Sequence, residues 1–164
     1  MEYIEARSKI KSGDILAWSH RGWKTWHDFK IQFVRMFTRS EYSHVGIAWV
    51  VGGRVFVIDS VIPKIRIIPL SNDLPVYWVP TNAKWKNETE QFALSLVGRG
   101  EYSQWEAIKA GAGIEIDGNN NLWQCAEFVS EVLKKDGLNL GDTATPSNVV
   151  QEALKSGKSI HYIE

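Results

Sequence analysis

The sequence predicts an α+β protein in which an antiparallel sheet of about five strands packs against helices. Two observations support this class: strand signals are concentrated between residues 14 and 79, and the rest of the chain carries mainly helical signals. The 164 residues contain no internal repeat, no low-complexity tract and no long linker, so we expect one domain over residues 1–164.

The expected strands are short runs that are rich in Val and Ile and are bounded by Gly or Pro, as is usual for strands in a sheet. They cover Asp14–Trp18, Val45–Val51, Val55–Val61, Ile65–Ile68 and Val76–Val79. The Gly52–Gly53 pair between the second and third runs is typical of a two-residue hairpin turn. In that register Val51 faces Arg54, and Gly46 therefore faces Asp59.

Helices are expected where apolar residues recur every three or four positions. Trp26, Phe29, Phe33 and Phe37 have this spacing, so a helix over about residues 25–37 should pack on the sheet. Contact of this basic, aromatic helix with an anionic membrane is the alternative. The other helices are expected over Glu88–Val97, from a capping box at Ser103–Glu106, over Gln124–Lys135 and over Ser147–Lys155.

The composition argues against several classes of partner. The 19 Lys and Arg residues balance 19 Asp and Glu residues, so no overall field attracts nucleic acid. No apolar run approaches the ~18 residues that a transmembrane helix needs. Residues 1–13 lack the apolar core of a secretory signal, which favours a cytoplasmic location and leaves delivery by a virion or a secretion system open.

Residue types that bind metals are few. The single cysteine allows neither an intramolecular disulfide nor a zinc site built from cysteines. His20, His27 and His161 lack the spacing of a metal site, and we expect them at the surface. The sequence therefore predicts no metal and no cofactor.

Cys125 lies near the start of an amphipathic helix. It shares one apolar stripe with Phe128, Val129, Val132 and Leu133, while lysines at the other end mark the direction of the helix dipole. A thiol in the first turn feels the positive end of that dipole, which favours the thiolate. The alternative is a buried structural cysteine, which is a common fate of free cysteines.

His44 and Asp59 fall on one face of the expected hairpin. Asp59 is diagonal to His44, at a distance of about 7–8 Å that two such side chains can bridge, and Gly46 leaves the space between them empty. The same face continues with Ala48 and Val57, which should pack under a helix. Taken separately, His44 could be a core histidine and Asp59 a residue that forms a turn.

Together, Cys125, His44 and Asp59 supply the residue types of a nucleophile, a base and an orienting acid. The imidazole withdraws the proton of the thiol, the carboxylate fixes the tautomer, and the thiolate attacks a carbonyl carbon. The spacing of the residues does not show that the helix of Cys125 docks on the face of the hairpin that bears His44.

A family resemblance supplies this docking. The chain resembles the circularly permuted branch of the NlpC/P60 papain-like superfamily, the YiiX/YaeF-type hydrolases, which are related to lecithin:retinol acyltransferases. The histidine precedes the cysteine here, as in the permuted group. That group often has Glu followed by Ala where this chain has Asp59 and Ser60. The matching segments cover most of the chain in family order: Ser12–Leu16, Tyr42–Ile47, Val57–Ser60, Gly98–Tyr102, Cys125–Val129 and Thr145–Val149.

The resemblance implies a permuted NlpC/P60 papain-like fold and a cysteine amidase or peptidase that acts through an acyl-enzyme, with Cys125, His44 and Asp59 as catalytic residues. The expected substrates are a peptide, a peptidoglycan fragment, or an acylated small molecule or lipid. Two alternatives stay open: a lipid acyltransferase or thioesterase that uses the same triad, and an inactive binding module of the same fold. Peripheral contact with a membrane also stays open.

Overall fold

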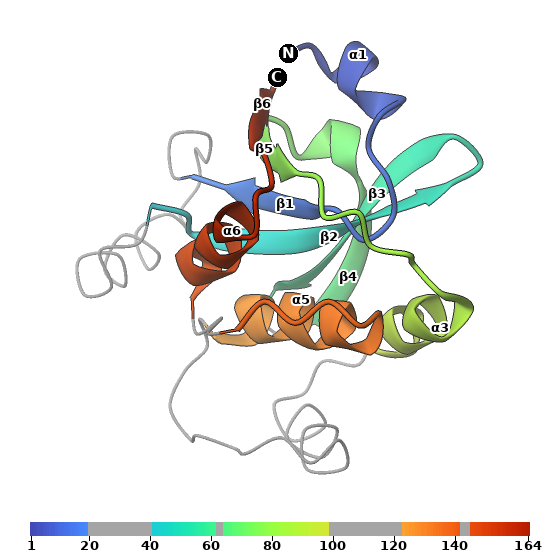
Figure 1. Ribbon diagram of the computed structural model, residues 1–164. Helices are drawn as coiled ribbons and strands as arrows, with labels where there is room; N and C mark the ends of the chain where they lie inside the picture. The colour runs from blue at the N-terminus through green and yellow to red at the C-terminus, as the bar shows by residue number, and fades with distance from the viewer. Residues whose placement is uncertain (20–40, 62–63, 99–122, 142–144) are drawn as a thin grey trace.

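The α+β class is confirmed by the architecture. The computed structural model describes residues 1–19, 41–61, 64–98, 123–141 and 145–164. Within these ranges, six strands form one antiparallel sheet in the order β4-β3-β2-β1-β5-β6, and four α-helices pack against it (Figure 1). No helix of these segments is long and apolar enough to cross a membrane.

All five expected strands are present, and a sixth strand was missed. The strands are β1 (Ile15–Trp18), β2 (His44–Val51), β3 (Arg54–Val61), β4 (Lys64–Pro69), β5 (Val76–Val79) and β6 (His161–Ile163). Strand β6 pairs with the edge of β5, placing Ile163 opposite Val76. It has only three residues, of which Ile163 alone is buried, so it offers no alternating pattern to detect.

The hairpin between β2 and β3 has the predicted register. Gly52 and Gly53 form the turn with φ angles of 58° and 71°, a conformation that glycine adopts without steric cost. Val51 faces Arg54 and Gly46 faces Asp59, as expected. The turn therefore fixes which residues of the two strands share a face.

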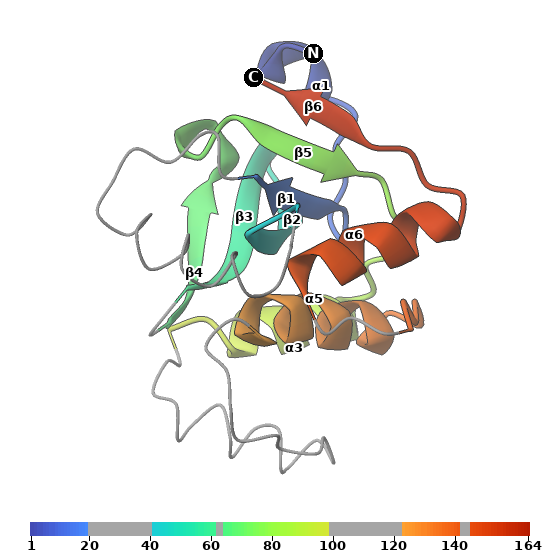
Figure 2. The same cartoon turned by 90° about the vertical axis from the view of Figure 1, so that its left-hand side faces the viewer.

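Three of the expected helices are also present. They are α3 (Asn87–Ser95), α5 (Trp123–Lys135) and α6 (Pro146–Lys155), and they cover one face of the sheet (Figure 2). The short helix α1 (Tyr3–Arg7) was not predicted, because its five residues are too few for an apolar period. The helices expected over residues 25–37 and from Ser103 lie outside the described residues.

The sheet separates two hydrophobic cores. Ile47 and Ile58 pack with Phe128 and Val132 of α5 on one face. Ala48 and Val57 point to the opposite face, where the core includes Ala6 of α1 and Leu70 of the 3-10 helix η2 (Leu70–Asn72). The expected docking of the Cys125 helix on the face of the hairpin that bears Asp59 is therefore wrong. Side chains alternate between the two faces of a strand, and α5 packs on the face of Ile47 and Ile58 instead.

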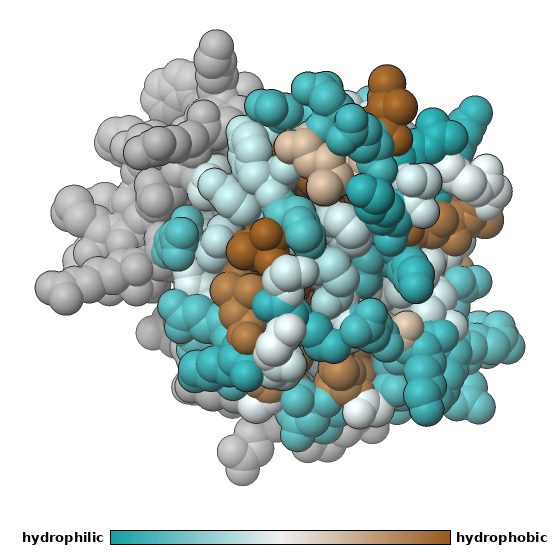
Figure 3. All heavy atoms as spheres, turned by 45° about the horizontal axis from the view of Figure 1, so that its top comes forward, coloured by the Kyte–Doolittle hydropathy of each residue, from teal (hydrophilic) through white to brown (hydrophobic). Residues whose placement is uncertain are grey.

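The surface near the chain ends is mixed. Apolar side chains lie there in small, separate groups among hydrophilic ones (Figure 3). Among the described residues, the exposed large hydrophobic side chains are Met1, Ile4, Val51 and Tyr162. The termini are close together, since the backbone N–H of Glu164 donates to the carbonyl of Met1 and that of Tyr3 donates to the carbonyl of Glu164.

Candidate active site

Cys125 occupies the first turn of α5 and is 6% exposed. The rest of its stripe, Phe128, Val129, Val132 and Leu133, is fully buried and anchors α5 on β2 and β3. Cys125 lies at the N-terminal end of α5, which is the positive end of the helix dipole, and Lys134 and Lys135 lie in the last turn at the negative end. Cys125 therefore lies on the buried stripe near the start of its helix, as predicted.

His44 and Asp59 are joined directly. His44 is the first residue of β2, and its Nε2–H donates to Oδ2 of Asp59 over 2.7 Å. The carboxylate of Asp59 is fully buried, whereas the side chain of His44 keeps 14% of its surface exposed. The imidazole therefore has a fixed orientation and remains accessible from solvent.

Gly46 makes room for this contact. A Cβ atom at Gly46 would lie 2.9 Å from Cγ1 of Val57, 3.0 Å from Cβ of Asp59 and 3.1 Å from the carbonyl oxygen of Ile58. These distances are too short for any other residue to fit without displacing its neighbours. The absence of a side chain at Gly46 is thus a requirement of the Asp59 conformation.

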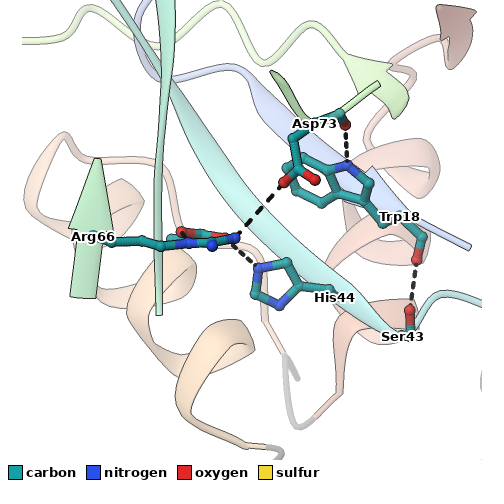
Figure 4. Close-up of polar contacts among 6 residues, drawn as sticks. Trp18, Ser43, His44, Arg66 and Asp73 are labelled. Atoms are coloured by element: carbon teal, nitrogen blue, oxygen red, sulfur yellow. Dashed lines mark hydrogen bonds and ion pairs between the residues drawn. The ribbon is translucent and has the colours of Figure 1, made fainter. Parts of the chain in front are cut away.

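Arg66 of β4 holds Asp59 from the other side, and sequence reasoning missed this residue. Its Nε–H donates to Oδ1 over 2.9 Å, and its Nη2–H donates to Oδ2 over 3.1 Å. Arg66 also lies 3.8 Å from Oδ2 of Asp73 (Figure 4). The register of β3 and β4, which places Arg66 opposite Asp59, would have identified it.

Trp18 lies beside the imidazole. Its ring centroid is 5.4 Å from that of His44, with the two planes tilted by 41°. The indole Nε1–H donates to the carbonyl of Asp73 over 2.7 Å, and the hydroxyl of Ser43 donates to the carbonyl of Trp18 over 3.1 Å (Figure 4). Packing and hydrogen bonds thus limit the movement of the His44 ring.

The electrostatics of the site favour a protonated His44. Burial by itself lowers the pKa of His44, but hydrogen bonds with Asp59 and Cys125, together with the charges of these two residues, raise it to about 10. Burial opposes ionisation of Asp59, yet the contacts with His44 and Arg66 keep the pKa of this carboxyl below its usual value. An imidazolium beside a carboxylate is the charge state that these contacts stabilise.

The three sequence-predicted residues are brought together. Because Nε2 of His44 faces Asp59, Nδ1 is the ring nitrogen left for the side-chain hydrogen bond with Cys125. Cys125 comes from α5, on one face of the sheet, and His44 is the first residue of β2. The two side chains therefore meet beside the start of β2. Such an arrangement can transfer the thiol proton to the imidazole and leave a nucleophilic thiolate.

Asp14, just before β1, is a structural residue. Its buried carboxylate accepts hydrogen bonds from the indole of Trp78 and the backbone N–H groups of Lys11 and Thr81. Burial raises the pKa of Asp14, while these donors oppose the increase. The residue ties the loop before β1 to the end of β5.

Fold and site together give an α+β domain in which a cysteine at the start of a helix meets a histidine on the sheet. Among solved structures, the chain is similar to the metalloprotein yiiX from Escherichia coli O157:H7, DUF1105, with a TM-score of 0.54 and 17% sequence identity. The match covers 80% of this chain and 69% of that chain, and it shows the permuted NlpC/P60-like fold. No protein-family model and no curated protein sequence matches the chain.

The description of yiiX as a metalloprotein does not fit the residues of this site. Within the described segments, no three His, Cys, Asp or Glu side chains come together in a way that could hold a metal ion. Nε2 of His44 and both oxygens of Asp59 are engaged in hydrogen bonds with protein groups. These atoms are committed to one another and are poorly placed to serve as metal ligands.

Proposed function

We propose that this chain is a papain-like cysteine hydrolase of the amidase or peptidase type, with Cys125 as nucleophile, His44 as general base and Asp59 as the residue that orients His44. The observation that carries the proposal is the continuous contact from Cys125 through His44 to Asp59. A merely structural cysteine needs neither the imidazole nor the buried carboxylate behind it.

In the proposed reaction, His44 takes the proton of Cys125, and the thiolate attacks the carbonyl carbon of the substrate. The resulting imidazolium then gives its proton to the leaving amine as the C–N bond breaks, which leaves a thioester on Cys125. Water attacks the thioester with His44 again as base. The acid product leaves, and the thiol is restored. Asp59 keeps its charge throughout and stabilises the imidazolium.

The developing oxyanion needs hydrogen-bond donors. The backbone N–H of Cys125, in the first turn of α5, is one donor in this proposal, since it lies at the positive end of the helix dipole. Tyr42 packs in the same core cluster as Cys125. Burial raises the pKa of Tyr42 to about 12, so its phenol remains protonated at neutral pH and is a candidate for the second donor.

The test is alkylation of the native protein by iodoacetamide between pH 5 and pH 9. We expect fast labelling at neutral and lower pH because His44 stabilises the thiolate, and slower labelling after His44→Ala. The urea-unfolded protein serves as the control for an ordinary thiol. A native rate that follows the same pH curve as the unfolded control would contradict the proposal.

Substrate class is tested separately. Cell-wall peptides and simple peptide amides form one panel, and acyl esters and thioesters form a second panel; Cys125→Ala is the inactive control for both. Turnover of the amide panel is expected. Turnover confined to the ester panel would instead identify an acyl hydrolase or transferase, and labelling without turnover of either panel would oppose hydrolysis of these substrates.

A further inference from the structure

Arg66 is placed by the sheet directly behind the proposed triad. It lies opposite Asp59 in the register of β3 and β4, and its side chain is 36% exposed while that of Asp59 is fully buried. The guanidinium thus reaches from the surface of the protein to a carboxylate that has no contact with solvent. A catalytic set of Cys125, His44 and Asp59 does not by itself predict a role for Arg66.

The geometry of this pair is bidentate. Nε and Nη2 of Arg66 donate to the two different oxygens of Asp59, over 2.9 Å and 3.1 Å. Oδ2 also accepts from His44, whereas Arg66 is the only partner of Oδ1 in the part of the chain that the structure describes. Two parallel hydrogen bonds fix the plane of a carboxylate, so Arg66 determines the direction in which Oδ2 faces the imidazole.

Asp73 balances the charge of Arg66. Its Oδ2 is buried, has no hydrogen bond among the described groups, and lies 3.8 Å from Nη2 of Arg66. The charged groups that face Asp59 are therefore His44 from β2 and Arg66 from β4, with Asp73 behind Arg66. With two carboxylates around it, Arg66 is poorly suited to attract an anionic substrate, which argues for a role within the protein.

We propose that Arg66 is a positioning residue that acts on His44 through Asp59. This inference deepens the proposed function and rests on it. Without the guanidinium, a buried carboxylate loses the partner of Oδ1 and can rotate away from the imidazole. The acid form of Asp59 also becomes more favourable, because one of the two groups that lower its pKa is gone.

The first experiment compares Arg66→Gln and Arg66→Lys in the alkylation assay. At pH 7, Arg66→Gln should react about tenfold more slowly, the order of one charge-assisted hydrogen bond, and the acid limb of its pH profile should move toward neutral pH. Arg66→Lys should recover part of the rate, since lysine keeps the charge but not the bidentate geometry. Arg54→Gln, on the exposed end of β3, is the matched control and should behave as wild type.

A double mutant separates positioning from direct contact with the reagent. In an Asp59→Asn background, Arg66→Gln should cause no further loss of rate, because its effect passes through Asp59. A loss of the same size in both backgrounds would overturn the inference. So would a wild-type pH profile for Arg66→Gln.

A readout that does not depend on the thiol distinguishes this inference from the proposed function. The low-field proton resonance of the His44 Nε2–H reports its hydrogen bond to Asp59 even if Cys125 is inert. We expect this signal in the wild type and in Arg54→Gln, and we expect it to weaken in Arg66→Gln while urea titration still shows a folded protein. An unchanged signal in a folded Arg66→Gln variant would overturn the inference whatever the reactivity of Cys125.

Discussion

At the scale of single residues, the site is built around the two nitrogens of one imidazole. Nε2 of His44 donates to a buried carboxylate, and the hydrogen bond with Cys125 falls to the opposite nitrogen. Trp18 restricts the ring from the side. The tautomer is therefore set by Asp59, and the proposed chemistry depends on it.

Replacing Asp59 tests this dependence. Asp59→Asn should lower the turnover of the proposed reaction by up to about 10⁴-fold, because an amide that turns its NH₂ group toward Nε2 favours the wrong tautomer. Asp59→Glu should retain more activity, since it keeps the charge for both His44 and Arg66 and only has to fit one more methylene. Measured kcat for the two variants gives the order, with a urea titration of each as the control for folding. Full activity in Asp59→Asn would remove Asp59 from the mechanism.

At the scale of the elements, the hairpin of β2 and β3 determines most of the alignment. Its glycine turn sets Gly46 opposite Asp59, and the missing side chain at Gly46 allows Asp59 to approach His44. The helix α5 contributes Cys125 to this arrangement. Errors in the strand register would therefore disrupt the site more than small shifts of the helix.

Gly46→Ala tests the alignment. The added Cβ atom collides with Val57 and Asp59, so we expect a loss of about 1–3 kcal/mol in the free energy of unfolding, together with slower alkylation of Cys125. Combining it with Val57→Ala removes the nearest contact, and should restore part of the stability without restoring the alkylation rate. Urea titration and iodoacetamide labelling measure the two effects. Wild-type labelling in Gly46→Ala would show that Asp59 tolerates displacement.

Sequence patterns predicted those elements that are determined by residues close together in the sequence. The Gly52–Gly53 turn and alternating strands gave the correct register, and the apolar stripe gave the buried face of α5. Strand β6 and helix α1 are too short to show a period. The role of Arg66 follows from the pairing of β4 with β3, and the Ile62–Pro63 pair between these strands is not a typical hairpin-turn sequence that would fix their register.

At the scale of the whole molecule, the site joins the two cores of the protein. Cys125 belongs to the core between the sheet and α5, whereas Trp18, beside His44, belongs to the core on the opposite face. The resemblance predicted the fold, but α5 was expected on the wrong face of the hairpin. Only tertiary packing decides which face a helix covers, and local patterns carry no information about it.

The pH dependence of folding can reveal whether the proton shared by the proposed catalytic pair lies on His44. In unfolded chains the pKa of a histidine is about 6.5 and that of a cysteine about 8.5. In the folded protein the pKa of His44 is raised to about 10. Protonation of His44 therefore stabilises the fold fully below pH ~6.5, and this stabilisation is lost as the pH rises from there toward about 10. The pH dependence of the unfolding free energy is different if the proton of Cys125 has moved to His44.

A thiolate and imidazolium pair holds one proton, and between about pH 6.5 and 8.5 the unfolded wild-type chain also holds one, on its thiol. The unfolding free energy of the wild type should therefore change little across this window. In Cys125→Ala we expect the contact with Asp59 to keep a proton on the folded His44, while the unfolded chain has none, so stability should fall as the pH rises. Urea titrations at about pH 6.5, 7.5 and 8.5 measure both slopes, and His44→Gln in the Cys125→Ala background should abolish the decline. Parallel slopes in the wild type and Cys125→Ala would show that Cys125 keeps its proton in the folded state, which the proposed mechanism does not allow.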